Sequence, residues 1–365
     1  MKKSFEPIKY KKMYESLLLA FLEKCLPESG RSLDIDGQHS FYMDIDNSFK
    51  GFWCMFDHDK IIGTVAVKEL NDKSCELKSL YLLKQYHGKG YGKCLLQKAI
   101  VYAKEYGYEN MYLDSLSTSK KAIALYRRSG FVDTERYNQN EHSDVFMVLD
   151  LKTVSEEWLV MSVIPSTDRI QEYIKEDDVI DYRNEIITGL ADSLFQKAGS
   201  ELEYIKVAYE YVRDNISHSA DINEDIITCT ASEVLRAGHG ICFAKSHLLA
   251  ALLRYKSIPT GFCYQKLILD DETAPVLIYH GLNGVYIKEY KKWIRLDARG
   301  NKERVNAQFS IDKEQLAFPV RLEKGEKDCF TVYPNPDLKV LEKLRTNKTR
   351  TELWNDLPTE LEYDL

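Results

Sequence analysis

The chain lacks any apolar run approaching the roughly 20 residues that a membrane-spanning helix needs, and its start, MKKSFEPIKYKK, lacks the apolar stretch of a secretion signal. We therefore expect a cytoplasmic protein with no membrane partner. Positive charge is also scarce, because 50 Lys and Arg stand against 57 Asp and Glu, for a net charge of -7 and a pI near 5.7. With no excess of cations to hold a phosphate backbone, a nucleic-acid partner is not expected.

Paired cysteines and the common cofactor motifs are missing as well. The 8 cysteines are scattered without a CxxC pair, so neither a disulfide scaffold nor a zinc site is indicated. HExxH, GxGxxG and GxxxxGK[ST] do not occur, which removes the commonest zinc-protease, dinucleotide and P-loop signatures. We expect reduced thiols and no metal.

What is present indicates two folded domains. At roughly 150 residues per domain, 365 residues predict two of them, and 44% hydrophobic with 12% aromatic residues is enough to build their cores. The pattern predicts a mixed α/β domain over 1–151, a connection over 152–174, an α+β domain over 175–330 in which helices precede strands, and a C-terminal extension over 331–365.

The spacing of apolar residues predicts the elements of each half. The first helix is expected to stop before Pro27, and glycines 107 and 130 follow the next two helices as caps. In the first half we predict helices over 10–26, 91–106 and 119–130, and strands over 51–56, 61–67, 75–83, 111–116, 131–137 and 144–151. In the second half we predict helices over 186–197, 202–215, 230–238 and 242–258, then strands over 261–269, 279–287 and 291–298.

The segment SLYLLKQYHGKGYGK at 79–93 places glycines where a predicted strand turns into a helix. Glycines allow a ligand to approach the backbone closely, and the first N–H groups of the helix can hold a pyrophosphate. A nucleotide-like anion is therefore one interpretation. A tight turn without a ligand is the other.

A second segment, SKKAIALYRRSGF at 119–131, adds to this pattern. Together the two resemble the GNAT acetyltransferase superfamily, whose core motif is R/Q-x-x-G-x-G/A and whose later helix carries A-x-x-x-Y followed by G-F. The resemblance covers about 1–151. His87 departs from it, since it stands where the family usually has Arg or Gln.

The resemblance implies acetyl-CoA as a cosubstrate and a small-molecule or peptide amine as the acceptor, chosen by loops at about 27–50 and 133–144. Tyr126 would be the general acid that protonates the CoA thiolate, and Glu76 a base or water-holding carboxylate, although a structural Glu on a strand is an equal alternative. Cofactor contacts are implied for Leu82, through its main chain, and for His87, Gly88, Lys89, Gly90, Tyr91, Gly92 and Ser119.

One cysteine of the second half has a chemical setting. Cys242 opens an apolar helix, where the helix-end N–H groups and dipole stabilise a thiolate. His280 begins one predicted strand and Asp297 ends the next, and adjacent antiparallel strands can bring these two together. His280 would then take the thiol proton while Asp297 orients the imidazole. A packing His and a turn-forming Asp are the structural alternatives.

This stretch resembles the transglutaminase-like superfamily, with G-x-C opening a helix, LLRYKSIP at 252–259, then His, then W-x-x-x-D at 293–297. The resemblance covers about 175–330 and implies that Cys242, His280 and Asp297 are nucleophile, general base and orienting acid. Many members read His-Ala-Trp where this chain has His-Gly-Leu at 280–282. His218 is a candidate oxyanion donor besides the Cys242 amide.

Such a site would attack an acyl or amide substrate and pass the acyl group to an amine or to water, and both outcomes stay open. A non-catalytic, substrate-binding C-terminal domain is the alternative hypothesis. A third possibility is a likeness to arylamine N-acetyltransferases, which share the Cys-His-Asp arrangement, but their characteristic surroundings are not evident in this sequence.

Overall fold

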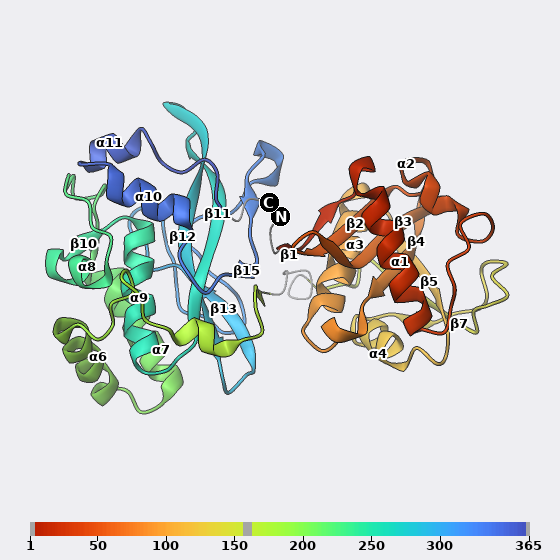
Figure 1. Ribbon diagram of the computed structural model, residues 1–365, viewed down its shortest axis with the longest axis horizontal. Coiled ribbons are helices and arrows are strands. Elements are labelled where there is room, and N and C mark those ends of the chain that lie inside the picture. The colour runs from red at the N-terminus through yellow and green to blue at the C-terminus, as the bar shows by residue number, and fades with distance from the viewer. Residues whose placement is uncertain (1–3, 156–162, 363–365) are drawn as a thin grey trace. The chain divides into compact units, whose positions relative to one another are not determined.

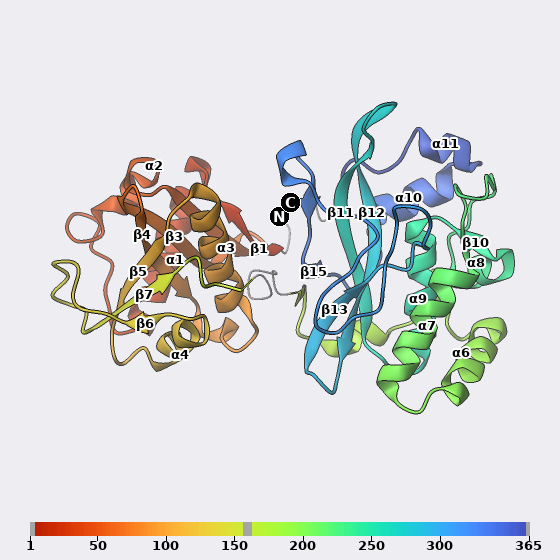
Figure 2. The same ribbon diagram turned by 180° about the vertical axis from the view of Figure 1, so that it is seen from behind.

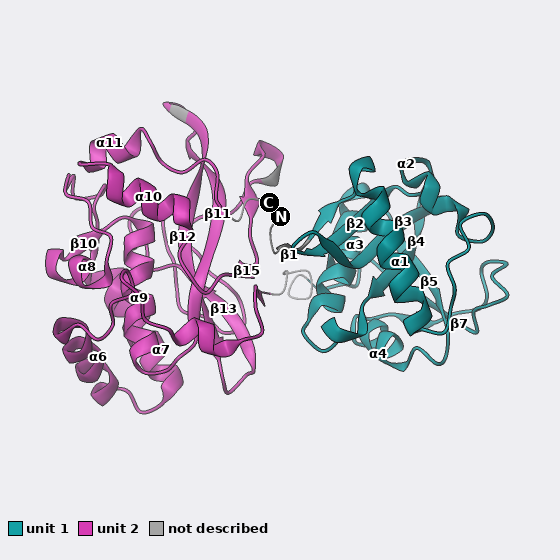
Figure 3. Cartoon of the chain, in the orientation of Figure 1, with its two compact units in different colours: residues 1–162, 365 teal, residues 163–364 magenta. Residues whose placement is uncertain are grey.

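The computed structural model describes residues 4–155 and 163–362. Contacts divide the chain into two compact units, residues 1–162 and residues 163–364, which are coloured separately in Figure 3. Residues 156–162, within the predicted connection 152–174, lie outside the described part. Each unit has its own sheet, as expected for two domains.

Unit 1 is built on a seven-stranded sheet in the order β1-β2-β3-β4-β5-β7-β6. The β4–β5 pair is parallel, and the other pairs are antiparallel. The strands are β1 (Ser4–Lys9), β2 (Gly51–Asp57), β3 (Lys60–Asn71), β4 (Ser74–Leu82), β5 (Asn110–Ser115), β6 (Val132–Asp133) and β7 (Val145–Asp150). This mixed sheet with flanking helices confirms the predicted α/β fold.

The helices of unit 1 cover both faces of this sheet. They are α1 (Glu15–Glu28), α2 (Ile45–Ser48), α3 (Tyr91–Tyr106) and α4 (Lys120–Arg128). Helix α1 lies on one face and α3 on the other (Figures 1 and 2). Helix α3 ends at Gly107, whose positive φ of 94° confirms the predicted cap.

Two sequence predictions for unit 1 are wrong. Helix α1 does not stop before Pro27 but runs through it to Glu28, since a proline in the last turn removes only one amide bond and Gly30, with φ of 75°, ends the helix two residues later. The strand expected over 131–137 shrinks to β6, because Tyr137 and Asn138 turn away to hydrogen-bond Glu76.

Strand β4 has an irregular register with β3, and its pairing with β5 ends before either strand does. The β3–β4 register shifts near Ser79, which has a positive φ of 52° and whose carbonyl accepts a 2.7 Å hydrogen bond from Thr64. Strands β4 and β5 pair only from Ser74–Asn110 to Glu76–Tyr112, although both run further. The two parallel strands therefore diverge toward the end of β4 that leads into α3.

Unit 2 contains a four-stranded antiparallel sheet in the order β13-β12-β11-β14 and two short parallel pairs, β9–β10 and β8–β15. The strands are β8 (Ile164–Pro165), β9 (Ser217–His218), β10 (His239–Gly240), β11 (Thr260–Asp270), β12 (Ala274–Ile287), β13 (Lys292–Leu296), β14 (Lys327–Asp328) and β15 (Thr331–Val332). The helices are α6 (Glu185–Lys197), α7 (Glu201–Asn215), α8 (Ala231–Ala237), α9 (Cys242–Tyr255), α10 (Leu338–Thr346) and α11 (Arg350–Trp354).

Helix α9 is the centre of unit 2. It packs against β11 and β12 and against α6, α7 and α8, and it is buried from Phe243 to Arg254. It ends at Tyr255 rather than at the predicted Ile258, because Ser257 takes a positive φ of 59° and bonds back to Arg254. Side chains of α10 and α11, including Val340 and Leu353, belong to the same core. No helix in the described ranges is both long and apolar enough to cross a membrane.

Candidate functional site

The glycine turn of unit 1 lies between the end of β4 and the start of α3. Gly88 and Gly90 have positive φ values of 80° and 88°, which L side chains rarely adopt, and no described atom lies within 4 Å of a Cβ built on either. Gly92 lies against α4, where a Cβ would stand 3.7 Å from Leu125. The backbone of the turn is therefore open to an anion next to the N-terminus of α3.

His87 is directed back toward the strand that precedes it. Its Nε2 lies 2.8 Å from the Leu82 carbonyl oxygen, and Lys89 places its ammonium 5.6 Å from the centre of the Tyr86 ring. The imidazole thus stabilises the turn instead of extending from it. A cofactor contact through the Leu82 carbonyl would have to share this oxygen with His87.

Tyr126 is buried in α4, with its ring 5.8 Å from that of Phe131. Burial, and next the neighbouring Tyr81 phenol, raise the pKa of Tyr126 well above its usual value, although Arg31 opposes this. Tyr81 belongs to β4, just before Leu82, so Tyr126 lies near the end of that strand. Ser119 stands at the start of α4, and its hydroxyl makes no capping bond to that helix.

Glu76 lies at the other end of β4, where β4 and β5 are still paired. Its side chain is buried, and Oε1 accepts hydrogen bonds from Tyr137 at 2.7 Å and Asn138 at 3.1 Å. Lys78 lies 3.0 Å from the same carboxylate and 3.2 Å from that of Asp114 on β5. Sequence reasoning missed this network, whose only signal is that Glu76 and Lys78 share a strand face.

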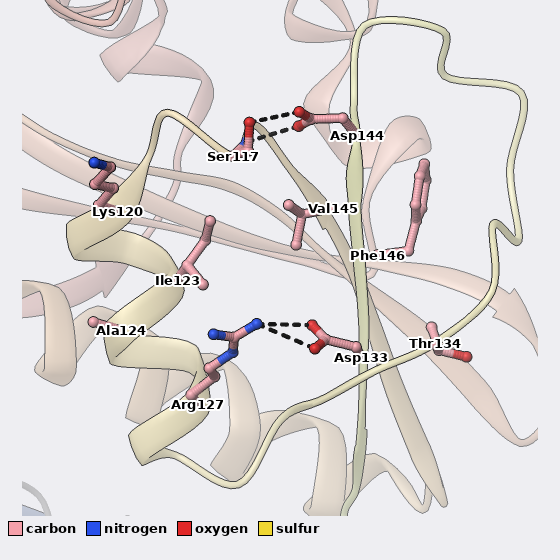
Figure 4. Close-up of a pocket in the computed structure, with 10 residues that line it drawn as sticks. All are labelled: Ser117, Lys120, Ile123, Ala124, Arg127, Asp133, Thr134, Asp144, Val145 and Phe146. Atoms are coloured by element: carbon pink, nitrogen blue, oxygen red, sulfur yellow. Dashed lines mark hydrogen bonds and ion pairs between the residues drawn. The ribbon is translucent and has the colours of Figure 1, made fainter.

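A hollow of about 570 Å³ lies between α4 and the strands β6 and β7 (Figure 4). Both carboxylates that line it have partners among the lining residues. Arg127 lies 3.1 Å from Asp133, and Asp144 accepts two 2.6 Å hydrogen bonds from Ser117. None of the predicted catalytic or cofactor-binding residues lines this hollow, although Asp133, Thr134 and Asp144 belong to the loop expected to choose the acceptor. We assign no function to it.

In unit 2, Cys242 is the first residue of α9, preceded by an extended Ile241. It is half-buried, whereas the other cysteines are all buried. The first N–H groups of a helix have no partner within the helix, and its dipole favours negative charge there. Cys242 is therefore the cysteine best placed to act as a nucleophile.

His280 and Asp297 meet through the antiparallel pairing of β12 with β13, which sets Asn283 opposite Leu296. The His280 Nε2 and the Asp297 Oδ2 are 2.8 Å apart, and both side chains are buried. Asp297 also accepts the backbone N–H groups of Arg299 at 3.1 Å and Ala317 at 3.0 Å. Because Nε2 faces the carboxylate, Nδ1 is the nitrogen left for the thiol.

The electrostatics of this pair involve Cys242 as well. Burial lowers the pKa of His280, but Asp297 and then Cys242, by charge and hydrogen bonding, outweigh it and raise that pKa to about 10. Burial would raise the pKa of Asp297, yet His280 and the two amides bring it below the usual value. The structure thus brings the three predicted residues together and favours an imidazolium between a carboxylate and a sulfur.

The raised pKa of His280 predicts a pH-dependent stability. A protonated group whose pKa rises on folding contributes stability that is complete below its unfolded value of about 6.5 and is lost as the pH rises through about 10. In urea unfolding, the stability advantage of the wild type over His280→Gln should therefore shrink between about pH 6 and about pH 10.5. The exposed His142, replaced by Gln, serves as the control, and a constant difference for His280→Gln would contradict the assignment.

Gly281 explains the departure from His-Ala-Trp. A Cβ at this position would stand 2.4 Å from the ring of Phe243, the residue after Cys242. The absence of a side chain lets α9 approach β12 closely beside His280. Phe318 completes the surroundings, with its ring centre 5.2 Å from that of the imidazole and the two rings nearly perpendicular.

Lys245, one turn after Cys242, is a buried residue that sequence reasoning missed. Its ammonium donates to the carbonyl oxygens of Ile216, of Arg299 at 3.0 Å and of Arg213 at 3.4 Å. Burial, and then the Arg299 cation, lower the pKa of Lys245 to about 7. Lys245 thus ties α9 to the segments that carry His218 and Asp297.

Among the described residues, no group of His, Cys, Asp and Glu side chains could hold a metal ion.

Residues 11–131 match the acetyltransferase (GNAT) family, and residues 188–298 match the transglutaminase-like superfamily. An uncharacterized N-acetyltransferase of Dictyostelium discoideum is 39% identical over 82 residues, which are 22% of this chain and 38% of that protein. The uncharacterized N-acetyltransferase YsnE of Bacillus subtilis is 32% identical over 104 residues, which are 27% of this chain and 69% of YsnE.

Among solved structures, a GNAT-family acetyltransferase of Staphylococcus aureus is 24% identical and aligns with 40% of this chain and 98% of its own, with a TM-score of 0.38. The chain spans 38 to 60% of the length of three of the curated relatives it matches. The first half of the chain belongs to the GNAT acetyltransferase family. The second half contains a domain of the transglutaminase-like superfamily, so both predicted resemblances, in their predicted order, are confirmed.

Proposed function

We propose that unit 1 is an acetyl-CoA-dependent N-acetyltransferase. The observation that carries this proposal is the open turn of Gly88 and Gly90 at the start of α3, beside two parallel strands that diverge. The turn would hold the pyrophosphate through main-chain amides of Gly88, Lys89, Gly90, Tyr91 and Gly92. Membership of the GNAT family supports the same cosubstrate.

In the proposed reaction an amine nitrogen attacks the thioester carbonyl, the nitrogen–carbon bond forms and the carbon–sulfur bond breaks. The CoA thiolate takes the phenolic proton of Tyr126, and the proton that the acylated nitrogen loses returns to the phenolate. A buried phenol with a raised pKa suits this task, because it keeps its proton until negative charge develops beside it. Leu82 and Ser119 are proposed to hold the pantetheine arm. The acceptor is proposed to be a small-molecule or peptide amine.

Glu76 stays a prediction as base or water-holding carboxylate. Because Tyr137, Asn138 and Lys78 occupy its Oε1, such a role would use the other oxygen. The same contacts fit the structural alternative, in which Glu76 anchors the 133–144 loop to β4. An unchanged rate in Glu76→Gln, with loss of stability, would favour the anchor.

We further propose that unit 2 is a thiol acyltransferase or amidase of the cytoplasm. The observation that carries it is the bonded His280–Asp297 pair beside Cys242 at the start of a helix. The sulfur would attack an acyl carbonyl to form a thioester, His280 would give its proton to the leaving group, and an amine or water would then take the acyl group.

Selective alkylation tests this second proposal. We expect iodoacetamide at pH 7 to label Cys242 much faster than the other cysteines, because it is half-buried at the start of α9 beside His280, whereas the other cysteines are buried. Burial raises the pKa of Cys25 to about 12 and of Cys229 to about 11, so these thiols are internal references. Peptide mapping by mass spectrometry gives the rate at each site.

The alternative is that unit 2 only binds substrates for the acetyltransferase. It predicts that Cys242 reacts no faster than an exposed thiol of a small peptide and that His280→Ala leaves the alkylation rate unchanged. Rapid labelling that His280→Ala abolishes would exclude it.

A further inference from the structure

His218 is a buried histidine near the thiol site. No described residue forms a hydrogen bond with one of its ring nitrogens, Nδ1. In the parallel β9–β10 pair, His218 lies opposite Gly240, two residues before Cys242. Buried polar groups in native proteins nearly always have partners, so an unpaired ring nitrogen here calls for an explanation.

The charges around His218 keep the ring neutral. Burial and then the Arg299 guanidinium lower the pKa of His218 to about 3, and Lys245 and His280 contribute less in the same direction. The negative charge of Asp221 opposes this shift but does not outweigh it. Asp221 is itself bound by Arg299 through two hydrogen bonds of 2.5 and 2.9 Å and by Lys302 at 2.7 Å. The ring therefore carries a single proton across the physiological pH range.

The position of that proton follows from the unpaired Nδ1. A buried N–H without an acceptor costs more than a buried lone pair, since the donor loses a hydrogen bond to water. The proton accordingly resides on Nε2, and the ring presents Nε2–H as a donor. The β9–β10 register sets His218 opposite Gly240, two residues before Cys242, and the ring is close enough to His280 for their charges to interact.

We propose that His218 is a catalytic residue of the thiol site, donating a hydrogen bond from its neutral imidazole to the oxyanion that forms when Cys242 attacks a carbonyl. In this step the carbon–sulfur bond forms and the carbonyl π electrons move to oxygen, which accepts hydrogen bonds from the Cys242 amide and from His218. Collapse restores the carbonyl and expels the leaving group with the proton of His280. The inference rests on the proposed nucleophilic role of Cys242.

Lys245 gives this donor its position. Its ammonium binds the carbonyl of Ile216, two residues before His218, and that of Arg299, two residues after Asp297. The same side chain therefore fixes the strand of His218 and the end of the Asp297 strand to the helix of Cys242. A fixed donor needs no reorganisation when charge develops, which is the condition for effective oxyanion stabilisation.

Two reagents separate this role from all others. Acylation of the full chain by p-nitrophenyl acetate passes through an oxyanion, whereas alkylation by iodoacetamide forms none. We expect His218→Ala to lower the acylation rate by about 100- to 1,000-fold and to change the alkylation rate by less than about threefold. His218→Gln, whose amide can donate from near the Nε2 position, should recover part of the acylation rate. Ser217→Ala, the exposed neighbour on β9, is the matched control.

The other possible results would contradict either the role of His218, the oxyanion site or the proposed function of unit 2. An unchanged acylation rate in His218→Ala assigns the ring to packing, and an equal fall in both rates assigns it to holding the thiolate. If the wild type alkylates rapidly at Cys242 but is acylated no faster than Cys242→Ala, the oxyanion site itself is rejected. Failure of the wild type to alkylate rejects the proposed function of unit 2. Circular dichroism monitors folding, and His218→Gln decides the question if His218→Ala does not fold.

Discussion

Asp297→Asn is expected to lower the rate at which p-nitrophenyl acetate acylates Cys242 by about 10,000-fold, which is the scale found when such a carboxylate is replaced in an acid–His–nucleophile triad. The carboxylate bonds Nε2 of His280 at 2.8 Å and raises the pKa of that ring, so it stabilises the imidazolium and directs Nδ1 to the sulfur. An amide carries no charge and can turn its NH₂ toward the ring, favouring the wrong tautomer.

The measurement is stopped-flow release of p-nitrophenol under single-turnover conditions. Asp312→Asn, an exposed aspartate at the surface of the same unit, is the matched control and should behave like the wild type. Alkylation by iodoacetamide should fall together with acylation in Asp297→Asn, unlike in His218→Ala. A loss of less than about tenfold would show that Asp297 serves the fold and not the reaction.

Tyr126→Phe is expected to lower kcat for acetyl transfer by about 100- to 1,000-fold while leaving the KM for acetyl-CoA nearly unchanged. The phenol is buried in α4 and its pKa is raised, and its removal would take away the proposed acid that neutralises the departing thiolate. Binding through the glycine turn does not involve this hydroxyl. A fall in kcat without a change in KM is therefore the signature of the proposed role.

A panel of primary amines and peptides, with acetylated products followed by mass spectrometry, first identifies an acceptor, and release of CoA then gives the rates. Tyr106→Phe, an exposed tyrosine on α3, is the control. Calorimetric binding of CoA to Tyr126→Phe checks that the turn is intact. If this variant loses CoA binding together with the rate, Tyr126 is a packing residue.

Local sequence patterns predicted most elements because their signals are local. The helix before Gly107 and the strands predicted over 51–56 and 61–67 depend on neighbouring residues alone. The errors at Pro27 and at 131–137 arise where longer-range contacts compete with local preference. In the second case the bonds from Tyr137 and Asn138 to Glu76 draw the chain away from the sheet.

The candidate sites divide in the same way. The glycine turn and the helix-opening Cys242 are visible in the sequence, because each depends on a few consecutive residues. The contacts of Lys245 join segments far apart in the chain, and the burial of the unpaired His218 Nδ1 depends on such segments. The spacing of residues in the sequence therefore predicts neither feature. The network of Glu76, Lys78 and Asp114 likewise exists only once β4 and β5 are paired.

The sequence by itself determined the two families, the order of the elements and the chemical types available, since these depend on composition, period and short motifs. Only the tertiary structure decided that Asp297 and Cys242 share His280, that His87 binds the strand before it, and that a buried ammonium ties the thiol helix to its neighbours. Protonation and hydrogen bonding depend on burial and on distances of a few ångströms between remote segments. These quantities exist only in the folded chain, so short patterns in the sequence do not show them.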